Sequence, residues 1–132
     1  MARARRTGQV LVVAFVDVDG LKSINDVEGH AAGDRALQQV ADALRSSLRS
    51  YDLVIRYGGD EFVCAMSGLT LADAEPRLAQ VNVGLGQGPH HRSVSVGLAQ
   101  LQHDDSLDSL VARADTALYV ARAGSSNVAS DC

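Results

Sequence analysis

Acidic residues at two places in this sequence have the chemistry and the surroundings of a cation site. At the first, Asp60 and Glu61 follow Gly58-Gly59 and lie between two β-prone runs, 53–57 and 62–66. We expect a β-hairpin with a two-residue Gly-Gly turn, since glycine supplies the positive φ that such turns require. A turn without side chains lets the phosphates of a ligand come close, and adjacent carboxylates there can hold a cation.

The second acidic pair is Asp17 and Asp19, at the end of a nearly continuous apolar run over 9–18. This run predicts a central strand covered on both faces. Residues two apart on an extended chain point to the same side, here at the strand end where ligands of α/β sheets bind. A polar strand end followed by a Gly20 turn is the plainer alternative. The presence of a second acidic pair favours metal binding.

The hydrophobic pattern predicts the elements that would position these carboxylates. Helices are expected over 21–28, 31–49, from Thr70 to the loop at 84–91, and over 106–123, and strands over 92–101 and 127–129. Two of these helices carry apolar stripes at helical spacing: Leu37, Val40, Ala41, Leu44 and Leu48 in the second helix, and Leu107, Leu110, Val111, Ala114, Leu118 and Ala121 in the last. Pro76 lies inside the third helix, which we expect to begin late or to kink.

The order of these elements predicts the fold class. Helix-bearing connections between strands, together with one tight hairpin, point to an α+β sandwich of the ferredoxin-like or palm type. In this architecture helices surround a central mixed, mostly antiparallel sheet. A chain of 132 residues is expected to form a single domain over residues 1–132.

Composition argues against several other classes of protein. A net charge of −4 gives no broad basic surface for a nucleic acid polymer. Cys64 and Cys132 form neither a disulfide framework nor a metal-ligand pattern, and the adjacent His90 and His91 lack the spacing that brings two ligands onto one helical face. The longest apolar run, 10–16, is too short to span a membrane. We therefore expect a cytoplasmic protein with no membrane segment in this chain.

Five motifs, in the right order, resemble those of the GGDEF family of diguanylate cyclase domains, which condense two GTP into cyclic di-GMP. They occupy residues 15–26, 29–34, 56–62, 93–97 and 113–119. The resemblance implies a metal-dependent nucleotidyltransferase that releases pyrophosphate. It implies a Mg²⁺ (or Mn²⁺) ion held by Asp17, Asp60 and the carbonyl of Val18, which are the hard oxygen ligands that this ion prefers.

The same resemblance implies roles around the nucleotide. Asn25 and Asp34 are expected to read the guanine edge, because an amide and a carboxylate suit its acceptor and donor groups. Lys22 and Arg122 would neutralise phosphate charge. The remaining expectations concern the hairpin, where Gly58 and Gly59 would lie against the nucleotide and Glu61 would help to deprotonate or position the attacking hydroxyl.

Catalysis in this family also implies a partner. One domain would hold one GTP, so two domains must face each other in a symmetric homodimer. The catalytic set implied by the resemblance is Asp60, Glu61 and Lys22, and which carboxylate serves as the general base stays open.

Arg49 and Asp52 form an Arg-x-x-Asp motif that precedes the hairpin, as in the product-inhibition site of the family. There Arg49 would grip a phosphate and a guanine of cyclic di-GMP, and Asp52 would accept from a guanine edge. The plainer alternative is a helix-end arginine paired with a nearby aspartate.

The chain departs from the family pattern at both ends. Residues 1–8 resemble only the tail of the helix that precedes the first strand, so we expect a fragment or a shortened variant. Ser126 stands where the family has an arginine. These departures favour an alternative in which the domain is catalytically weak or inactive and serves as a GTP or cyclic di-GMP binding module. A purely structural dimerisation domain is the third possibility.

Overall fold

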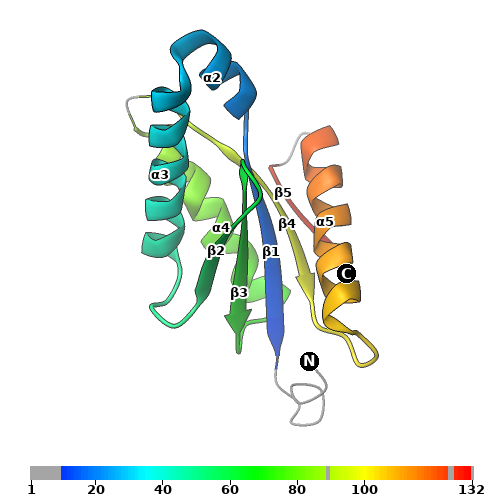
Figure 1. The fold of residues 1–132 in the computed structure, drawn as a ribbon. Coiled ribbons are helices and arrows are strands. Elements are labelled where there is room, and N and C mark those ends of the chain that lie inside the picture. The colour runs from blue at the N-terminus through cyan, green and yellow to red at the C-terminus, as the bar shows by residue number, and fades with distance from the viewer. Residues whose placement is uncertain (1–9, 89, 125–126, 132) are drawn as a thin grey trace.

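The computed structural model describes residues 10–88, 90–124 and 127–131 (Figure 1). The expected helix remnant at 1–8, Ser126 and Cys132 lie outside these residues. The elements are β1 (Leu11–Val18), α2 (Leu21–Glu28), α3 (His30–Ser47), β2 (Leu53–Tyr57), β3 (Glu61–Ser67), α4 (Leu71–Gly86), β4 (Val94–Gln100), α5 (Leu107–Ala123) and β5 (Val128–Asp131). The strands form one sheet in the order β2-β3-β1-β4-β5, antiparallel except for the parallel pair β4 and β5. The predicted α+β fold with a mixed, mostly antiparallel sheet is confirmed.

β1 is the middle strand, and helices cover both of its faces (Figure 1). On one face Val12, Val16 and other residues of β1 pack against α2, α3 and α4. On the other face Val13 and Phe15 pack against α5. Every residue of β1 after Leu11 is buried, which explains why its sequence is apolar rather than alternating.

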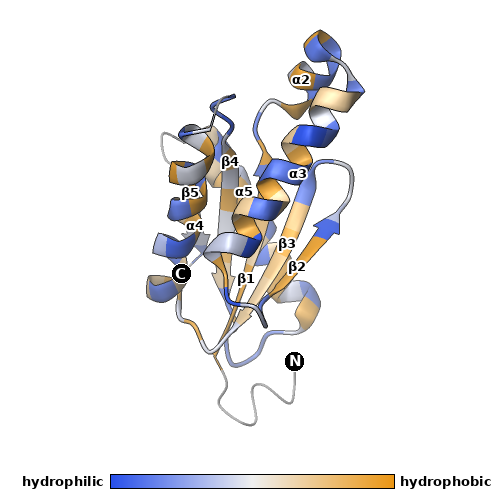
Figure 2. Cartoon of the chain, turned by 90° about the vertical axis from the view of Figure 1, so that its left-hand side faces the viewer, coloured by the Kyte–Doolittle hydropathy of each residue, from blue (hydrophilic) through white to orange (hydrophobic). Residues whose placement is uncertain are grey.

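The apolar stripe predicted for the long helix at 31–49 is buried. Four of its residues lie in α3, and the fifth, Leu48, caps the end of that helix. The edge strand β2 is less covered: Leu53, Ile55 and Tyr57 are each more than half exposed. Figure 2 shows β2 and β3 largely in hydrophobic colours, whereas the helices alternate between hydrophilic and hydrophobic faces. No helix in the described part of the chain is long and apolar enough to cross a lipid bilayer.

The hairpin loop is longer than the sequence predicts. The register of β2 with β3 leaves three residues, 58–60, in the loop instead of two. Of these only Gly58 has a positive φ, at 75°. The additional residue is held from outside the hairpin, because the backbone N–H of Val18 donates to the carbonyl of Asp60 at 3.2 Å. The predicted two-residue turn was wrong. The longer loop is explained by the contact of Asp60 with β1, a strand outside the hairpin.

α4 also differs from the prediction. It begins at Leu71, since Thr70 and Asp73 form a complete capping box, and it continues through Pro76. The predicted late start was therefore wrong. The helix continues past the expected start of the loop at residue 84 and ends at Gly86. Burial of Leu85 outweighs the poor helix propensity of the two glycines in this last part.

In α5 one member of the predicted stripe is misplaced. Leu107 is 53% exposed, because it is the first residue of the helix and precedes the turns that pack on the sheet. Leu110, Ala114 and Leu118 are buried as predicted.

Candidate active site at the carboxyl end of β1

Asp17 lies near the end of β1 and is the most buried carboxylate of the site. It pairs with Glu61 of β3 on one side and with Ser95 of β4 on the other. The residue is only 4% exposed. Its Oδ2 is 2.8 Å from Nη1 of Arg122, in the last turn of α5. Its Oδ1 is buried and has no hydrogen-bond partner among the described residues.

This environment changes the acidity of Asp17. Burial raises its pKa from an ordinary 3.8 to about 6; Arg122 opposes the rise, and the negative charges of Asp60, Glu61 and Asp19 add to it. The carboxylate is therefore held in a setting that disfavours its own charge and that a cation would relieve.

One contact ties the hairpin loop to this strand end, and a second fixes the loop itself. The bond from the Val18 N–H to the Asp60 carbonyl joins the loop to β1. Within the hairpin, Nη2 of Arg56 donates to the carbonyl of Gly59 at 2.8 Å. The loop therefore brings Asp60 and Glu61 to the end of β1. Burial raises the pKa of Glu61, and the charges of Asp60 and Asp115 raise it further.

Asp19 has a different environment from Asp17. Its Oδ2 accepts from Oγ of Ser93 at 2.6 Å and its Oδ1 from Oγ of Ser95 at 2.7 Å. Its backbone N–H donates to the carbonyl of Ser93 at 3.1 Å. Both carboxylate oxygens are thus engaged in fastening the loop after β1 to β4. The role of these serines was missed at the sequence level, although their alternation with valines places both on one face of the strand.

The donor set around Asp17 suits Mg²⁺. No group of three or more His, Cys, Asp or Glu side chains converges on one point within residues 10–88, 90–124 and 127–131. Mg²⁺ does not need such a group, since it is usually held by one or two carboxylates with waters and substrate phosphates. The unpartnered Oδ1 of Asp17, beside the charge of Asp60, fits that pattern.

Asn25 and Asp34 come from two helices that pack against each other. Asn25 lies on α2, and its side chain rests directly against Gly33 of α3, where a Cβ would collide with the amide oxygen. Asp34 follows Gly33 and borders a cavity of about 400 Å³ that Arg56 and Phe62 also line. The glycine thus fixes where the amide of Asn25 can lie, a role that was missed at the sequence level because it needs the packing of α2 on α3.

The two cations predicted to hold phosphates are both accessible. Lys22 is exposed in the first turn of α2. The side chain of Arg122 is 59% exposed although one of its nitrogens contacts Asp17. Arg122 can therefore turn toward solvent without unfolding any element.

Arg49 and Asp52 form a closed pair at the end of α3. Nη2 and Nε of Arg49 donate to the two carboxylate oxygens of Asp52 at 2.7 and 3.0 Å. Nη2 also donates to the carbonyl of Ser67 at 2.6 Å, and the guanidinium lies 4.5 Å above the ring of Tyr51. Burial would raise the pKa of Asp52, but the hydrogen bonds and charge of Arg49 outweigh it and lower that pKa. The structure thus brings together the two residues of the predicted motif.

Comparison with known proteins identifies the family. The sequence profile described as "Diguanylate cyclase, GGDEF domain" matches residues 1–128. The chain is 38% identical over 130 residues to diguanylate cyclase DosC of Escherichia coli (strain K12), covering 92% of this chain and 28% of that protein. It is 35% identical over 135 residues to response regulator PleD of Caulobacter vibrioides, covering 95% of this chain and 30% of that protein. The chain therefore spans less than a third of these curated relatives.

Solved structures show the same fold. The GGDEF domain of DgcB from Caulobacter crescentus, in complex with c-di-GMP, superposes with a TM-score of 0.90 at 27% identity, covering 98% of this chain and 82% of that chain. The active GGEEF domain of a diguanylate cyclase from Vibrio cholerae superposes with a TM-score of 0.91 at 29% identity, covering 98% of this chain and 87% of that chain. The family profile, the sequence identities and the fold agree, and the chain belongs to the diguanylate cyclase GGDEF domain family.

Proposed function

We propose that this domain condenses two GTP into cyclic di-GMP and two pyrophosphates. The observation that carries the proposal is Asp17: a buried carboxylate with one unpartnered oxygen, facing the carboxylates of the GGDEF hairpin. An unsatisfied buried oxygen costs about 1–3 kcal/mol and calls for a functional explanation. Membership of the family supports a cation and a nucleotide triphosphate as that explanation.

The metal would be Mg²⁺ or Mn²⁺, held by Asp17, Asp60 and the carbonyl of Val18. When bound, it would neutralise the negative charge that develops on the phosphates. The three ligands come from the end of β1 and from the hairpin loop, which the bond between Val18 and Asp60 holds together.

The nucleotide would lie over the hairpin and reach the α2–α3 pair. Asn25 and Asp34 would select guanine, the amide against Gly33 and the carboxylate at the edge of the 400 Å³ cavity. Lys22 and Arg122 would hold the phosphates. Arg122 would leave Asp17 for a phosphate oxygen when a metal takes its place, a move that its exposed position permits.

In the chemical step the 3′-hydroxyl of one GTP attacks the α-phosphorus of the other, and pyrophosphate leaves. The second bond forms in the same way with the roles of the two nucleotides exchanged. Each domain would present one GTP, so two domains must meet face to face in a homodimer. Glu61, whose pKa is raised by burial and by Asp60, would accept or orient the proton of the hydroxyl. The compartment that we propose for this reaction is the cytoplasm, where GTP would be available.

The Arg49–Asp52 pair would serve as the product site. The GGDEF domain of DgcB was solved in complex with c-di-GMP. Here the pair is preassembled, and the side chain of Arg49 is still 22% exposed. The same observation favours the second candidate function, a domain that binds cyclic di-GMP or GTP without turnover.

The experiment is incubation of the purified chain at high concentration with GTP and Mg²⁺, followed by chromatography for cyclic di-GMP. Asp60→Ala should abolish metal-dependent product formation while leaving the fold intact. Asp104→Ala is the matched control, since that carboxylate is 96% exposed and far along the chain from the hairpin. If the Asp60 variant still makes product, the metal assignment is wrong. If the wild-type chain binds nucleotide but makes no product, the domain is a binding module or needs a dimerising segment for turnover, and fusion of a dimeriser to the chain separates these two outcomes.

A further inference from the structure

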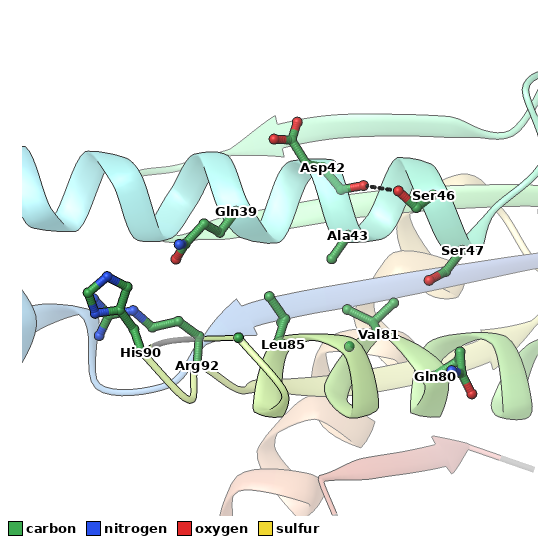
Figure 3. A pocket seen from close by; sticks show the side chains of 12 residues that line it. Gln39, Asp42, Ala43, Ser46, Ser47, Gln80, Val81, Leu85, His90 and Arg92 are labelled. Carbon is green, nitrogen blue, oxygen red and sulfur yellow. Dashed lines mark hydrogen bonds between the residues drawn. The ribbon is translucent and has the colours of Figure 1, made fainter.

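A cavity of about 550 Å³ lies between α3 and α4 (Figure 3). Its size is within the range of small-molecule sites, about 300–1,000 Å³. It shares no lining residue with the cavity beside Asp34 or with the one beside Arg49 and Asp52. It is therefore separate from the proposed guanine site and from the proposed product site.

One part of this cavity is an apolar wall. Ala43 projects from α3, and Val81 and Leu85 project from α4 toward it (Figure 3). Gly84 adds a stretch of helix surface without a side chain. The wall offers the hydrophobic contact area that binding sites for organic ligands usually have.

The other end of the cavity is polar and incompletely hydrogen-bonded. Gln39 reaches down from α3 toward Arg92, whose side chain runs beside His90 (Figure 3). Oε1 of Gln39 and Nε of Arg92 are both buried, and neither has a hydrogen-bond partner among the described residues. An orphaned acceptor and an orphaned charged donor thus border the same cavity.

The charge at this end is positive. Arg92 makes no ion pair with any residue in the described ranges. Asp42 also lines the cavity, but its carboxylate accepts from Gln38 at 2.9 Å and points away from α4 (Figure 3). Asp19 and Glu28 line a neighbouring cavity that Arg92 also lines, but neither forms an ion pair with it. An anion between α3 and α4 would therefore meet a guanidinium without an ion-pair partner among the described residues.

We propose that this cavity binds a small organic anion with an apolar body. A carboxylate or phosphate monoester would accept from Arg92, and a hydroxyl or N–H of the ligand would donate to Gln39. The apolar body would cover Ala43, Val81 and Leu85. A single water could satisfy both orphaned atoms, but a water occupies only about 30 Å³ and would leave the apolar wall uncovered.

The test is a titration of the isotope-labelled chain, followed by NMR, with 4-hydroxybenzoate and 4-hydroxyphenyl phosphate as probes. Neutral 4-hydroxybenzyl alcohol controls for apolar contact alone. Binding should shift the amide resonances of 39–43 and 81–85, and the two anions should bind at least tenfold more tightly than the alcohol. Whichever anion binds more tightly identifies the preferred headgroup.

Two variants separate charge from shape. Arg92→Gln should weaken binding of both anions about tenfold, the effect of losing a charge-assisted hydrogen bond. Gly84→Leu should block the cavity, since no atom lies within 4 Å of a Cβ built there and leucine favours a helix more than glycine does. Arg49→Ala is the control for binding at the proposed product site and should leave probe affinity unchanged. Wild-type affinity in both cavity variants, or shifts confined to the Arg49 region, would overturn the proposal.

Discussion

Replacing Asp17 by Asn should make the metal-free protein more stable at neutral and alkaline pH. The pKa of Asp17 rises from 3.8 to about 6 on folding, first because the side chain is buried. At about 1.4 kcal/mol per pKa unit, this difference corresponds to about 3 kcal/mol of strain in the charged native state. Asparagine has nearly the same shape without the charge. Arg122 loses its partner in the variant, but its exposed guanidinium remains solvated.

The pH dependence has a defined sign. Folding raises the pKa of this carboxylate, so the native state is stabilised when the carboxylate is protonated. This stabilisation is complete below the unfolded pKa of 3.8, and it is lost as the pH rises through the folded pKa of about 6. The variant and the wild type should therefore have the same free energy of unfolding below about pH 3. The variant should be more stable by up to about 3 kcal/mol at about pH 8.

The assay is urea denaturation in the presence of a chelator, with the far-ultraviolet circular dichroism as the signal and the same m-value required of both proteins. Asp104→Asn, at an exposed carboxylate, controls for a general change in net charge. Added Mn²⁺ should reduce the difference in free energy of unfolding between the two proteins at about pH 8, because only the wild type can bind it through an ionised Asp17. A variant that is no more stable than the wild type at that pH, in the absence of metal, would refute this account of the site.

Three other substitutions test contacts that the structure shows. Gly33→Ala should leave the melting temperature nearly unchanged but raise the KM for GTP about threefold to tenfold, since the new methyl displaces only the flexible end of Asn25. An unchanged KM in steady-state kinetics would mean that Asn25 does not read guanine. Gly97→Ala should destabilise the fold by about 1–3 kcal/mol or more, measured by thermal unfolding, because the methyl meets the backbone of α5; an unchanged melting temperature would mean that α5 packs further from β4. Arg49→Ala should weaken binding of cyclic di-GMP more than tenfold in calorimetry, and unchanged affinity would remove the product site from this position.

Local periodicity predicted most of the helices and strands because burial in this fold is itself periodic. β1 reads as a continuous apolar run since helices cover both faces, and the stripe of α3 faces the sheet at every turn. The errors lie where a contact from elsewhere in the chain overrides local preference. Burial of Leu85 extends α4 through two glycines, and the bond from Val18 to Asp60 lengthens the hairpin loop.

The candidate site was predictable in its carboxylates but not in the groups that position them. Acidic residues after a strand and after a glycine turn are visible as patterns along the chain. The contact between Asp19 and Ser93 joins residues 74 apart, and that between Asn25 and Gly33 depends on how α2 packs on α3. Such contacts depend on the register of β1 with β4 and on the packing of α2 on α3. Neither can be predicted from the pattern of residues along one segment of the chain.

The ion pair between Asp17 and Arg122 connects stability with the proposed chemistry. Arg122 satisfies one oxygen of the buried carboxylate and leaves the other without a partner. The ion pair therefore lowers the free-energy cost of keeping Asp17 charged, but part of this cost remains, as the raised pKa of Asp17 shows. A bound metal would remove the remaining cost and release Arg122 toward the phosphates of the same nucleotide. The strain in the free protein would thus favour binding of the metal and movement of Arg122 toward the phosphates together, because the metal takes over the buried charge that Arg122 now partners.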